Sequence, residues 1–159
     1  MRIKVALMMI LLVLLSVGTA LSQAPVTMYD TLKAAGNFKT FLSAVDKANV
    51  KTLQQMPGDF TLFAPTDEAF GTLLADLGVT PEQLLANPDL SSILLYHVLG
   101  SREGALQLLR VRNVTTLQGD DLSVRLQRFG VYVNDSRVIN PNINAPNGFI
   151  HTIDKVLLP

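Results

Sequence analysis

The hydrophobic pattern of this chain changes its period near Asn113, and that change limits the folds it can adopt. Upstream, apolar residues such as Phe38, Phe41 and Val45 recur at the three- and four-residue intervals of one helix face. Downstream, apolar and polar residues alternate, as in the segment 122–127, which is typical of half-buried strands. Helices followed by an antiparallel meander, without regular β-α-β alternation, predict an α+β fold rather than a doubly wound parallel sheet.

Capping signals mark where the expected helices begin. We expect helices to start at or just after Asn37, Thr66, Thr80, the segment 87–89 and Ser101. The clearest signal is Thr80-Pro81-Glu82-Gln83, where Pro occupies the first helical position and Gln the third, as in a capping box. The helix that opens at 87–89 carries apolar residues as far as Val98.

A short apolar segment, Phe60–Ala64, lies within the helical part of the chain. Its aromatic and apolar composition is typical of a buried strand, and Pro65 follows directly. Because the other expected strands lie after Asn113, this early strand has to join the later sheet.

Composition excludes several classes of protein. The chain has no cysteine, so it has no disulfide framework, thiolate metal site or cysteine nucleophile. Its two histidines, His97 and His151, are too few for a histidine-rich metal site, and we expect no metal or other cofactor. Thirteen Lys and Arg balance thirteen Asp and Glu, which argues against a dedicated nucleic-acid binder.

The first twenty residues have the pattern of a secretory signal peptide. Arg2 and Lys4 precede the apolar run Val5–Leu15, and small residues follow it. We expect cleavage after Ala20, with a site as late as Ala24 as the alternative. The run is shorter than the ~20 apolar residues of a membrane-spanning helix. We therefore expect removal of this segment, no stable membrane span afterwards, and a secreted, periplasmic or extracellular product.

Three segments, in this order, resemble the signatures of the fasciclin (FAS1) domain family. Phe60–Phe70 is similar to the first signature of strand, Pro-Thr-Asp turn and helix, and Tyr96-His97-Val98 resembles the central tyrosine–histidine motif. Asn147–Leu157 is similar to the closing signature. The resemblance covers residues 28–158 and implies a small secreted single-domain member. It also implies a compact wedge of small antiparallel sheets packed against helices, acting in adhesion rather than catalysis.

Some signature residues have a structural explanation. Thr66 is a good N-cap, and Asp67 and Glu68 lie in the first helical turn, where the helix dipole favours acidic side chains. Adjacent helical residues point about 100° apart, so these two carboxylates are poorly placed to share a substrate or a metal. His151 lies between Ile150 and Thr152 in an expected strand, and we interpret it as a sheet-face residue.

Tyr96 and His97 are the first pair of candidate interaction residues. The resemblance associates their motif with adhesion as well as with the integrity of the fold. The apolar segment Ile93–Leu99 instead favours a buried imidazole, which needs partners for both ring nitrogens. Hydroxyl or carboxylate groups of the first signature are the expected partners.

Asn142 and Asn144 are the second pair, in a segment, 140–147, that we expect to be a polar, irregular loop. Its prolines lower the entropy lost on binding, and its asparagines can both donate and accept hydrogen bonds. An equally supported alternative is a solvated connection restricted by proline. Some animal family members carry an integrin-binding Asp-Ile pair here. Asn142 stands at the aspartate position, which argues against integrin binding through this loop.

The sequence thus predicts a secreted, non-catalytic module that binds a cell-surface or matrix protein or polysaccharide. A small-molecule or lipid carrier is the first alternative. Apolar residues that could line its cavity are Met56, Phe70, Leu74, Leu77 and Leu85. A hydrolase is the second alternative: the chain has no nucleophile-elbow, phosphate-loop or H-E-x-x-H motif, but a serine triad could assemble from distant residues.

Overall fold

The computed structural model describes residues 27–50, 54 and 59–159, and the predicted signal peptide lies outside them. The elements are, in chain order, α1 (Met28–Ala35), α2 (Lys39–Ala48), β1 (Phe60–Pro65), α4 (Asp67–Leu77), α5 (Pro81–Leu85), α6 (Leu90–Leu95), β2 (Val98–Leu99), α7 (Ala105–Val111), β3 (Asn113–Thr115), β4 (Asp121–Gln127), β5 (Gly130–Val133), β6 (Ser136–Ala145) and β7 (Gly148–Ile153). Helices dominate the first part and strands the last, so the α+β prediction is confirmed.

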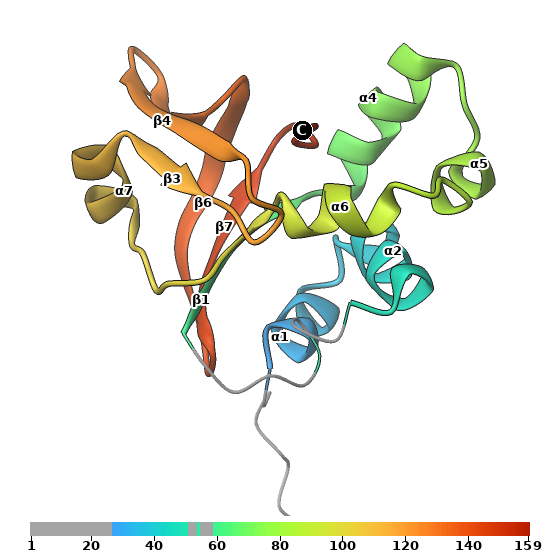
Figure 1. Ribbon diagram of the computed structural model, residues 1–159, viewed down its shortest axis with the longest axis horizontal. Helices are drawn as coiled ribbons and strands as arrows, with labels where there is room; N and C mark the ends of the chain where they lie inside the picture. Colours follow the sequence, from blue (N-terminus) through green and yellow to red (C-terminus); the bar gives the residue numbers. More distant parts are fainter. Residues whose placement is uncertain (1–26, 51–53, 55–58) are drawn as a thin grey trace, which may run out of the picture.

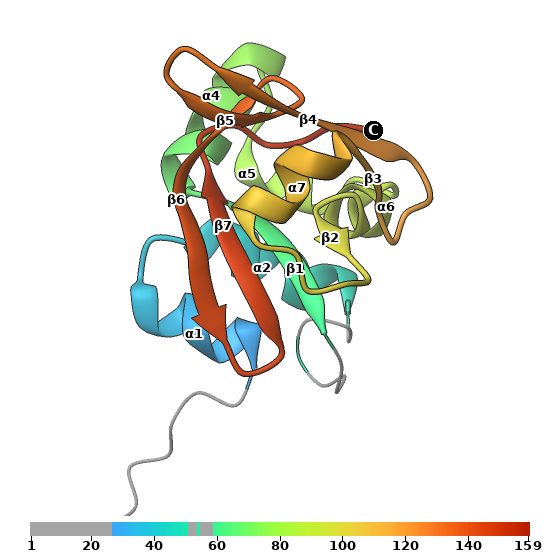
Figure 2. The ribbon, with the colours of Figure 1, turned by 90° about the vertical axis from the view of Figure 1, so that its left-hand side faces the viewer.

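Seven strands form the sheet, in the order β2-β1-β7-β6-β5-β4-β3. The early strand β1 does join the later strands, as predicted, and it lies between β2 and β7. Its pairing with β7 is parallel, from Phe60↔Gly148 to Pro65↔Ile153, whereas the other pairs are antiparallel. Figure 2 shows β6, β7 and β1 side by side. The predicted antiparallel pairing thus holds for the other strand pairs, and this central parallel pair is the exception to it.

The helices α1, α2, α4, α5 and α6 lie on one side of the molecule, and β3 to β6 with α7 lie on the other (Figure 1). Strand β1 separates two apolar clusters, because neighbouring residues of a strand point to opposite faces. Leu62 belongs to the helix-side core with Phe41 and Ile150. Phe63 belongs to the sheet-side core, with Leu108 of α7 among its members. This two-sided burial explains why Leu62 and Phe63 are both large and apolar although they are adjacent in the strand.

Two predicted caps are confirmed. The Thr66 hydroxyl accepts a hydrogen bond from the Ala69 amide at 3.2 Å, and Thr80 forms a complete capping box with Gln83. The predicted cap of α2 is wrong, because Phe38 rather than Asn37 holds that position and makes no side-chain cap.

Asp67 supplies the cap that α2 lacks. Its carboxylate accepts a hydrogen bond from the Thr40 amide, near the start of α2, at 2.7 Å. Its own amide donates to the Asn37 carbonyl at 3.0 Å. The aspartate of the first signature therefore joins α4 to α2, in agreement with the structural role predicted for it.

Two helix boundaries differ from the sequence predictions. The helix α6 ends at Leu95, and Val98 belongs to β2, where it pairs with Leu62. The helix α7 begins at Ala105 rather than near Ser101. Thr61 explains the second difference, because its hydroxyl donates to the Ser101 carbonyl at 2.6 Å and accepts from the Glu103 amide at 2.8 Å. These bonds hold the segment before α7 against β1.

The predicted loop at 140–147 is wrong for most of its length, because β6 continues to Ala145. The strand keeps its pairing with β7 through register shifts between Val138 and Asn140 and between Asn140 and Ile143. Asn142, with φ of 58°, lies in the second of these irregularities. Such bulges take up extra residues without ending the ladder, which is why an Asn- and Pro-rich segment is a strand here.

Candidate functional site

His97 has no exposed surface, and both of its ring nitrogens are bonded to the backbone. Its Nδ1–H donates to the Ile93 carbonyl at 2.7 Å, and its Nε2 accepts from the Leu157 amide at 2.9 Å. The ring is therefore neutral and fixed in one tautomer. The burial predicted for His97 is observed, but its expected partners in the first signature are wrong. The imidazole instead links α6, through the Ile93 carbonyl, to the C-terminal segment, through the Leu157 amide.

Burial lowers the pKa of His97 to about 4, and its bond to the Ile93 carbonyl only partly offsets this shift. An unfolded histidine takes up a proton below about pH 6.5. Between these two pH values the unfolded state binds more protons than the folded state. The free energy of unfolding therefore decreases by ~1.4 kcal/mol for each unit by which the pH is lowered. We expect the free energy of unfolding to decrease by about 3 kcal/mol on account of His97 as the pH falls from about 6.5 to about 4.

Urea denaturation at a series of pH values measures this loss, and an NMR titration of the His97 ring assigns it. A ring that titrates near pH 6.5 in the folded protein would contradict the prediction.

His151, on β7, is bonded in the same way with the opposite tautomer. Its Nε2–H donates to the Glu103 carbonyl at 2.9 Å, and its Nδ1 accepts from the Asn142 amide at 3.0 Å. The ring is buried and stacks on Phe63, with 5.7 Å between the ring centroids. Burial lowers the pKa of His151 as well. His151 thus joins β7 to β6 and to the segment before α7, consistent with a structural role.

Tyr96 is 5% exposed and joins the helical part to the β4–β6 strands. Its hydroxyl donates to the Asp121 carbonyl at 3.2 Å and accepts from Asn134 Nδ2 at 3.1 Å. The other side-chain atom of Asn134, Oδ1, accepts from the Ser123 amide at 2.9 Å. Asn134 has φ of 52° and forms the β5–β6 turn. The bond between Asn134 and Tyr96 is not expected from the sequence, because the two residues lie far apart in the chain.

Asn142 and Asn144 lie on the exposed edge of β6, and each has its Oδ1 bonded inside the fold. Asn142 Oδ1 accepts from the Ala105 amide at 3.0 Å and so caps α7. Asn144 Oδ1 accepts from the Arg102 guanidinium. Arg102 also lies 4.5 Å from the Phe149 ring centroid and 3.8 Å from Asp59. The role of Arg102 is not predictable from the sequence, because nothing near it in the chain indicates partners about forty residues away.

The geometry gives neither histidine a catalytic arrangement. A general base needs a ring nitrogen that can accept a proton from a substrate. In His97 and His151 the unprotonated nitrogen already accepts a backbone N–H, and the other already donates to a carbonyl. In the part of the chain that the structure describes, no three metal-ligating side chains gather into a group.

The residues proposed for a carrier cavity are dispersed. Met56 lies outside the described residues. Phe70 is buried in the helix-side core, with its ring centroid 6.5 Å from that of Phe41. Leu77, at the end of α4, is exposed. Phe70 and Leu77 therefore do not line a common cavity, and their placement does not support the carrier alternative.

Comparisons with known proteins agree with this architecture. The fasciclin domain family model matches residues 36–159. An uncharacterized protein of Synechocystis sp. is 39% identical over 121 residues, which are 76% of this chain and 89% of that protein. The cell surface glycolipoprotein MPB83 of Mycobacterium bovis is 33% identical over 144 residues, covering 90% of this chain and 60% of the relative.

A solved structure gives the same result for the fold. It is a FAS1 domain pair from the insect cell adhesion molecule Fasciclin I, with a TM-score of 0.56 and 18% identity. The match covers 78% of this chain and 46% of that chain. With the family match over most of its length and a relative that it nearly spans, the chain belongs to the fasciclin domain family.

Proposed function

We propose that the protein is an exported, non-catalytic interaction module that attaches to a cell-surface or matrix protein or polysaccharide through Asn142 and Asn144. The observation that carries the proposal is the anchoring of these two exposed side chains. Each Oδ1 is bonded to an interior or neighbouring group, and this fixes the orientation of the Nδ2 group on the same side chain. Side chains that are ordered before binding lose less entropy when a partner is bound.

Family relationship supports the location and the absence of catalysis. One relative is a cell surface glycolipoprotein, and the fold matches that of a cell adhesion molecule. Among the helices of the described residues, none has the length and apolar character needed to cross a membrane. The signal-peptide pattern of the first twenty residues favours export. The backbone bonds of the two histidines argue against hydrolysis.

Tyr96 and His97 act in this proposal by positioning rather than by contact. Both side chains are buried, so a partner on the surface does not reach them. Tyr96 fixes the β5–β6 turn through Asn134, and β6 carries the two asparagines. A substitution at Tyr96 would therefore weaken attachment indirectly, by disturbing the structure of β6.

We expect the double variant Asn142→Gly, Asn144→Asp to weaken attachment about tenfold, the value of one or two lost hydrogen bonds. Glycine accepts the φ of 58° at position 142, and aspartate keeps an acceptor for Arg102. Attachment is measured by binding of the immobilised protein to a matrix-protein preparation and a cell-wall polysaccharide preparation.

The matched control is Gln107→Ala, which removes another hydrogen bond at the start of α7, to the Gly104 amide, but leaves β6 unchanged. Equal loss in the control and the double variant would show that destabilised α7 is the cause. Unchanged attachment in the double variant would overturn the asparagine site.

A further inference from the structure

The second half of β4 has an open edge. β3 pairs with β4 only from Asn113↔Ser123 to Thr115↔Asp121, whereas β5 covers the other side of β4 from Val124 to Gln127. The Val124 amide still bonds to the Arg112 carbonyl, on the β3 side. Because backbone groups alternate along a strand, the N–H and C=O of Leu126 face the same side, beyond the last pair with β3. A strand could be added there.

A groove with a volume of about 610 Å³ runs along this open edge. The groove residues, as we call them, come from the end of α7, the start of β3 and β4: Leu109, Arg112, Asn113, Ser123, Val124, Arg125, Leu126 and Gln127. Two of them are arginines and none is acidic. Among the described residues the only ion pair is Arg102–Asp59, so neither groove arginine has a carboxylate partner there.

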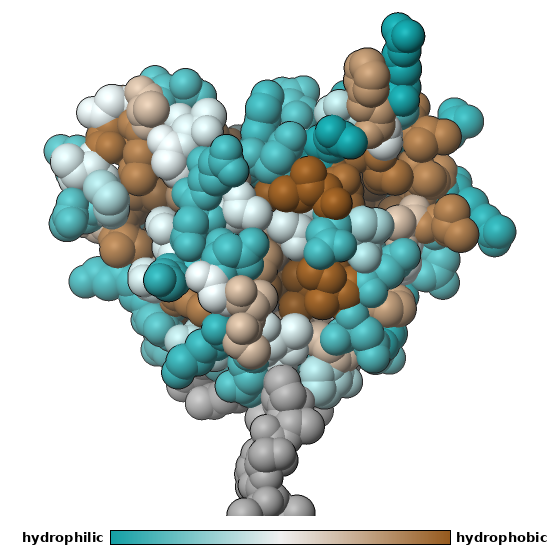
Figure 3. Space-filling view, turned by 180° about the vertical axis from the view of Figure 1, so that it is seen from behind, coloured by the Kyte–Doolittle hydropathy of each residue, from teal (hydrophilic) through white to brown (hydrophobic). Residues whose placement is uncertain are grey.

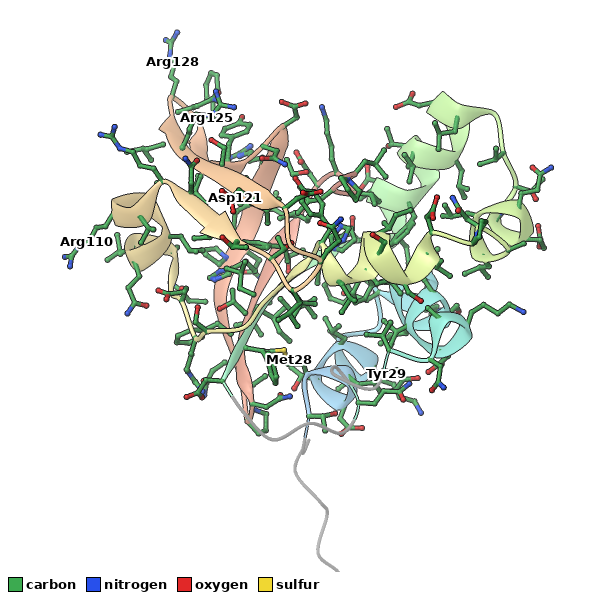
Figure 4. All side chains as sticks on the ribbon, in the orientation of Figure 1. Met28, Tyr29, Arg110, Asp121, Arg125 and Arg128 are labelled. Carbon is green, nitrogen blue, oxygen red and sulfur yellow. The ribbon has the colours of Figure 1, made fainter. Side chains whose placement is uncertain are left out.

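Positive charge gathers at this end of the molecule. All arginines except Arg2 follow residue 100 in the chain. Figure 4 shows Arg110, Arg125 and Arg128 projecting outward at the end opposite α4 and α5. Because the groove itself is lined by two arginines and no acidic residue, its charge favours an anionic partner.

Apolar surface accompanies the charge. Leu126 is 71% exposed in the groove, and Phe129, in the β4–β5 hairpin, is 65% exposed. Figure 3 shows hydrophobic side chains at the upper right, where this hairpin lies when the molecule is seen from behind. Open backbone groups, unpaired guanidinium groups and exposed apolar side chains thus occur together at the end of β4 and in the segments next to it.

We propose that the open edge of β4 binds an extended acidic peptide segment of a partner protein, which adds to the sheet as a further strand. The Leu126 backbone pairs with the segment, Arg112 and Arg125 bind its carboxylates, and Leu126 contacts its apolar side chains. A peptide suits this edge better than an acidic polysaccharide, because only a peptide offers amides and carbonyls at strand spacing. The surface is separate from the asparagines of β6, and the inference does not depend on them.

The probe is a fluorescent eight-residue peptide that alternates valine with glutamate, and the matched probe replaces each glutamate with glutamine. We expect the acidic peptide to bind the full-length protein, and Arg125→Gln to weaken its binding at least about tenfold, as for loss of a charge-assisted bond. Arg110→Gln, a residue of α7 that is not among the groove residues, should change binding little. On binding, hydrogen exchange of the Leu126 amide should slow.

Leu126→Pro separates strand addition from simple attraction of charge. It removes the edge-facing N–H and keeps both arginines, and proline is tolerated on an open edge. We expect it to abolish peptide binding while circular dichroism shows an unchanged fold. Should it fail to fold, an acidic peptide N-methylated at alternate amides makes the same test. Equal binding of polygalacturonate and the acidic peptide, unaffected by Leu126→Pro, would overturn the proposal. Absence of peptide binding would also overturn it, and the arginines would then be explained as charges that prevent edge-to-edge aggregation.

Discussion

Replacing Gly148 with alanine is expected to destabilise the fold by about 4 kcal/mol or more, a large share of the ~5–15 kcal/mol by which a folded domain is typically stable. Gly148 has φ of 147°, which side chains with a Cβ rarely adopt. A Cβ would meet the Phe60 carbonyl oxygen and Met28 Cε far inside van der Waals contact, and would lie 2.7 Å from the Phe60 carbonyl carbon. Met28 Cε can move, but Phe60 is fixed by its pairing with Gly148.

Gly71→Ala is the matched control, because the same change at that position is expected to stabilise. Gly71 lies inside α4, and among the described residues no atom beyond its chain neighbours and the nearby backbone of its own helix lies within 4 Å of the position its Cβ would take. Alanine is favoured over glycine in a helix by about 0.5–1 kcal/mol. Denaturation with urea measures both variants. A Gly148→Ala protein as stable as the parent would show that β1 and β7 do not approach so closely.

His97→Ala is expected to cost about 3–5 kcal/mol at neutral pH. The change leaves the Ile93 carbonyl and the Leu157 amide without partners, and each buried group left unsatisfied costs about 1–3 kcal/mol. It also leaves a cavity near Phe41, whose ring centroid lies 6.2 Å from that of the imidazole. As the pH falls from about 6.5 to about 4, the difference from the parent should shrink, because the parent loses the contribution of neutral His97 over this range.

His97→Gln tests whether the hydrogen bonds cause this loss. Its amide offers one donor group and one acceptor, and it should recover part of the stability that alanine loses. Urea denaturation gives the stability, and binding to the matrix and polysaccharide preparations gives attachment. A His97→Ala protein of unchanged stability that no longer attaches would show that the motif acts in binding and not in the fold.

The sequence was informative where the cause of a structure is local. The caps at Thr66 and Thr80 depend on residues three positions away, and the structure has both. The predicted partners of His97 were wrong, because the actual partners are backbone groups, which any residue at 93 and any residue except proline at 157 would supply. The strand at 140–145 was missed because the bulges of β6 depend on pairing with β7, and no local preference encodes that.

The open edge of β4 is another feature that the local sequence does not predict. Its residues alternate as in an ordinary strand, and nothing in them indicates that β3 ends after three pairs. The uneven distribution of arginine along the chain was visible in the sequence and points toward the same end of the molecule. Charge distribution along a chain is therefore a signal that can be used before a structure is known.

The parallel pairing of β1 with β7 has a consequence for the order of events in synthesis. β1 is synthesised early, but β7, with which it pairs along its whole length, comes from the last residues of the domain. His97 likewise cannot form its bond to the Leu157 amide until sixty further residues have been made. A ribosome-bound chain that lacks this last segment has neither the central strand pair nor the histidine bond. Formation of the central part of the sheet is therefore delayed until the last segment of the domain has been made.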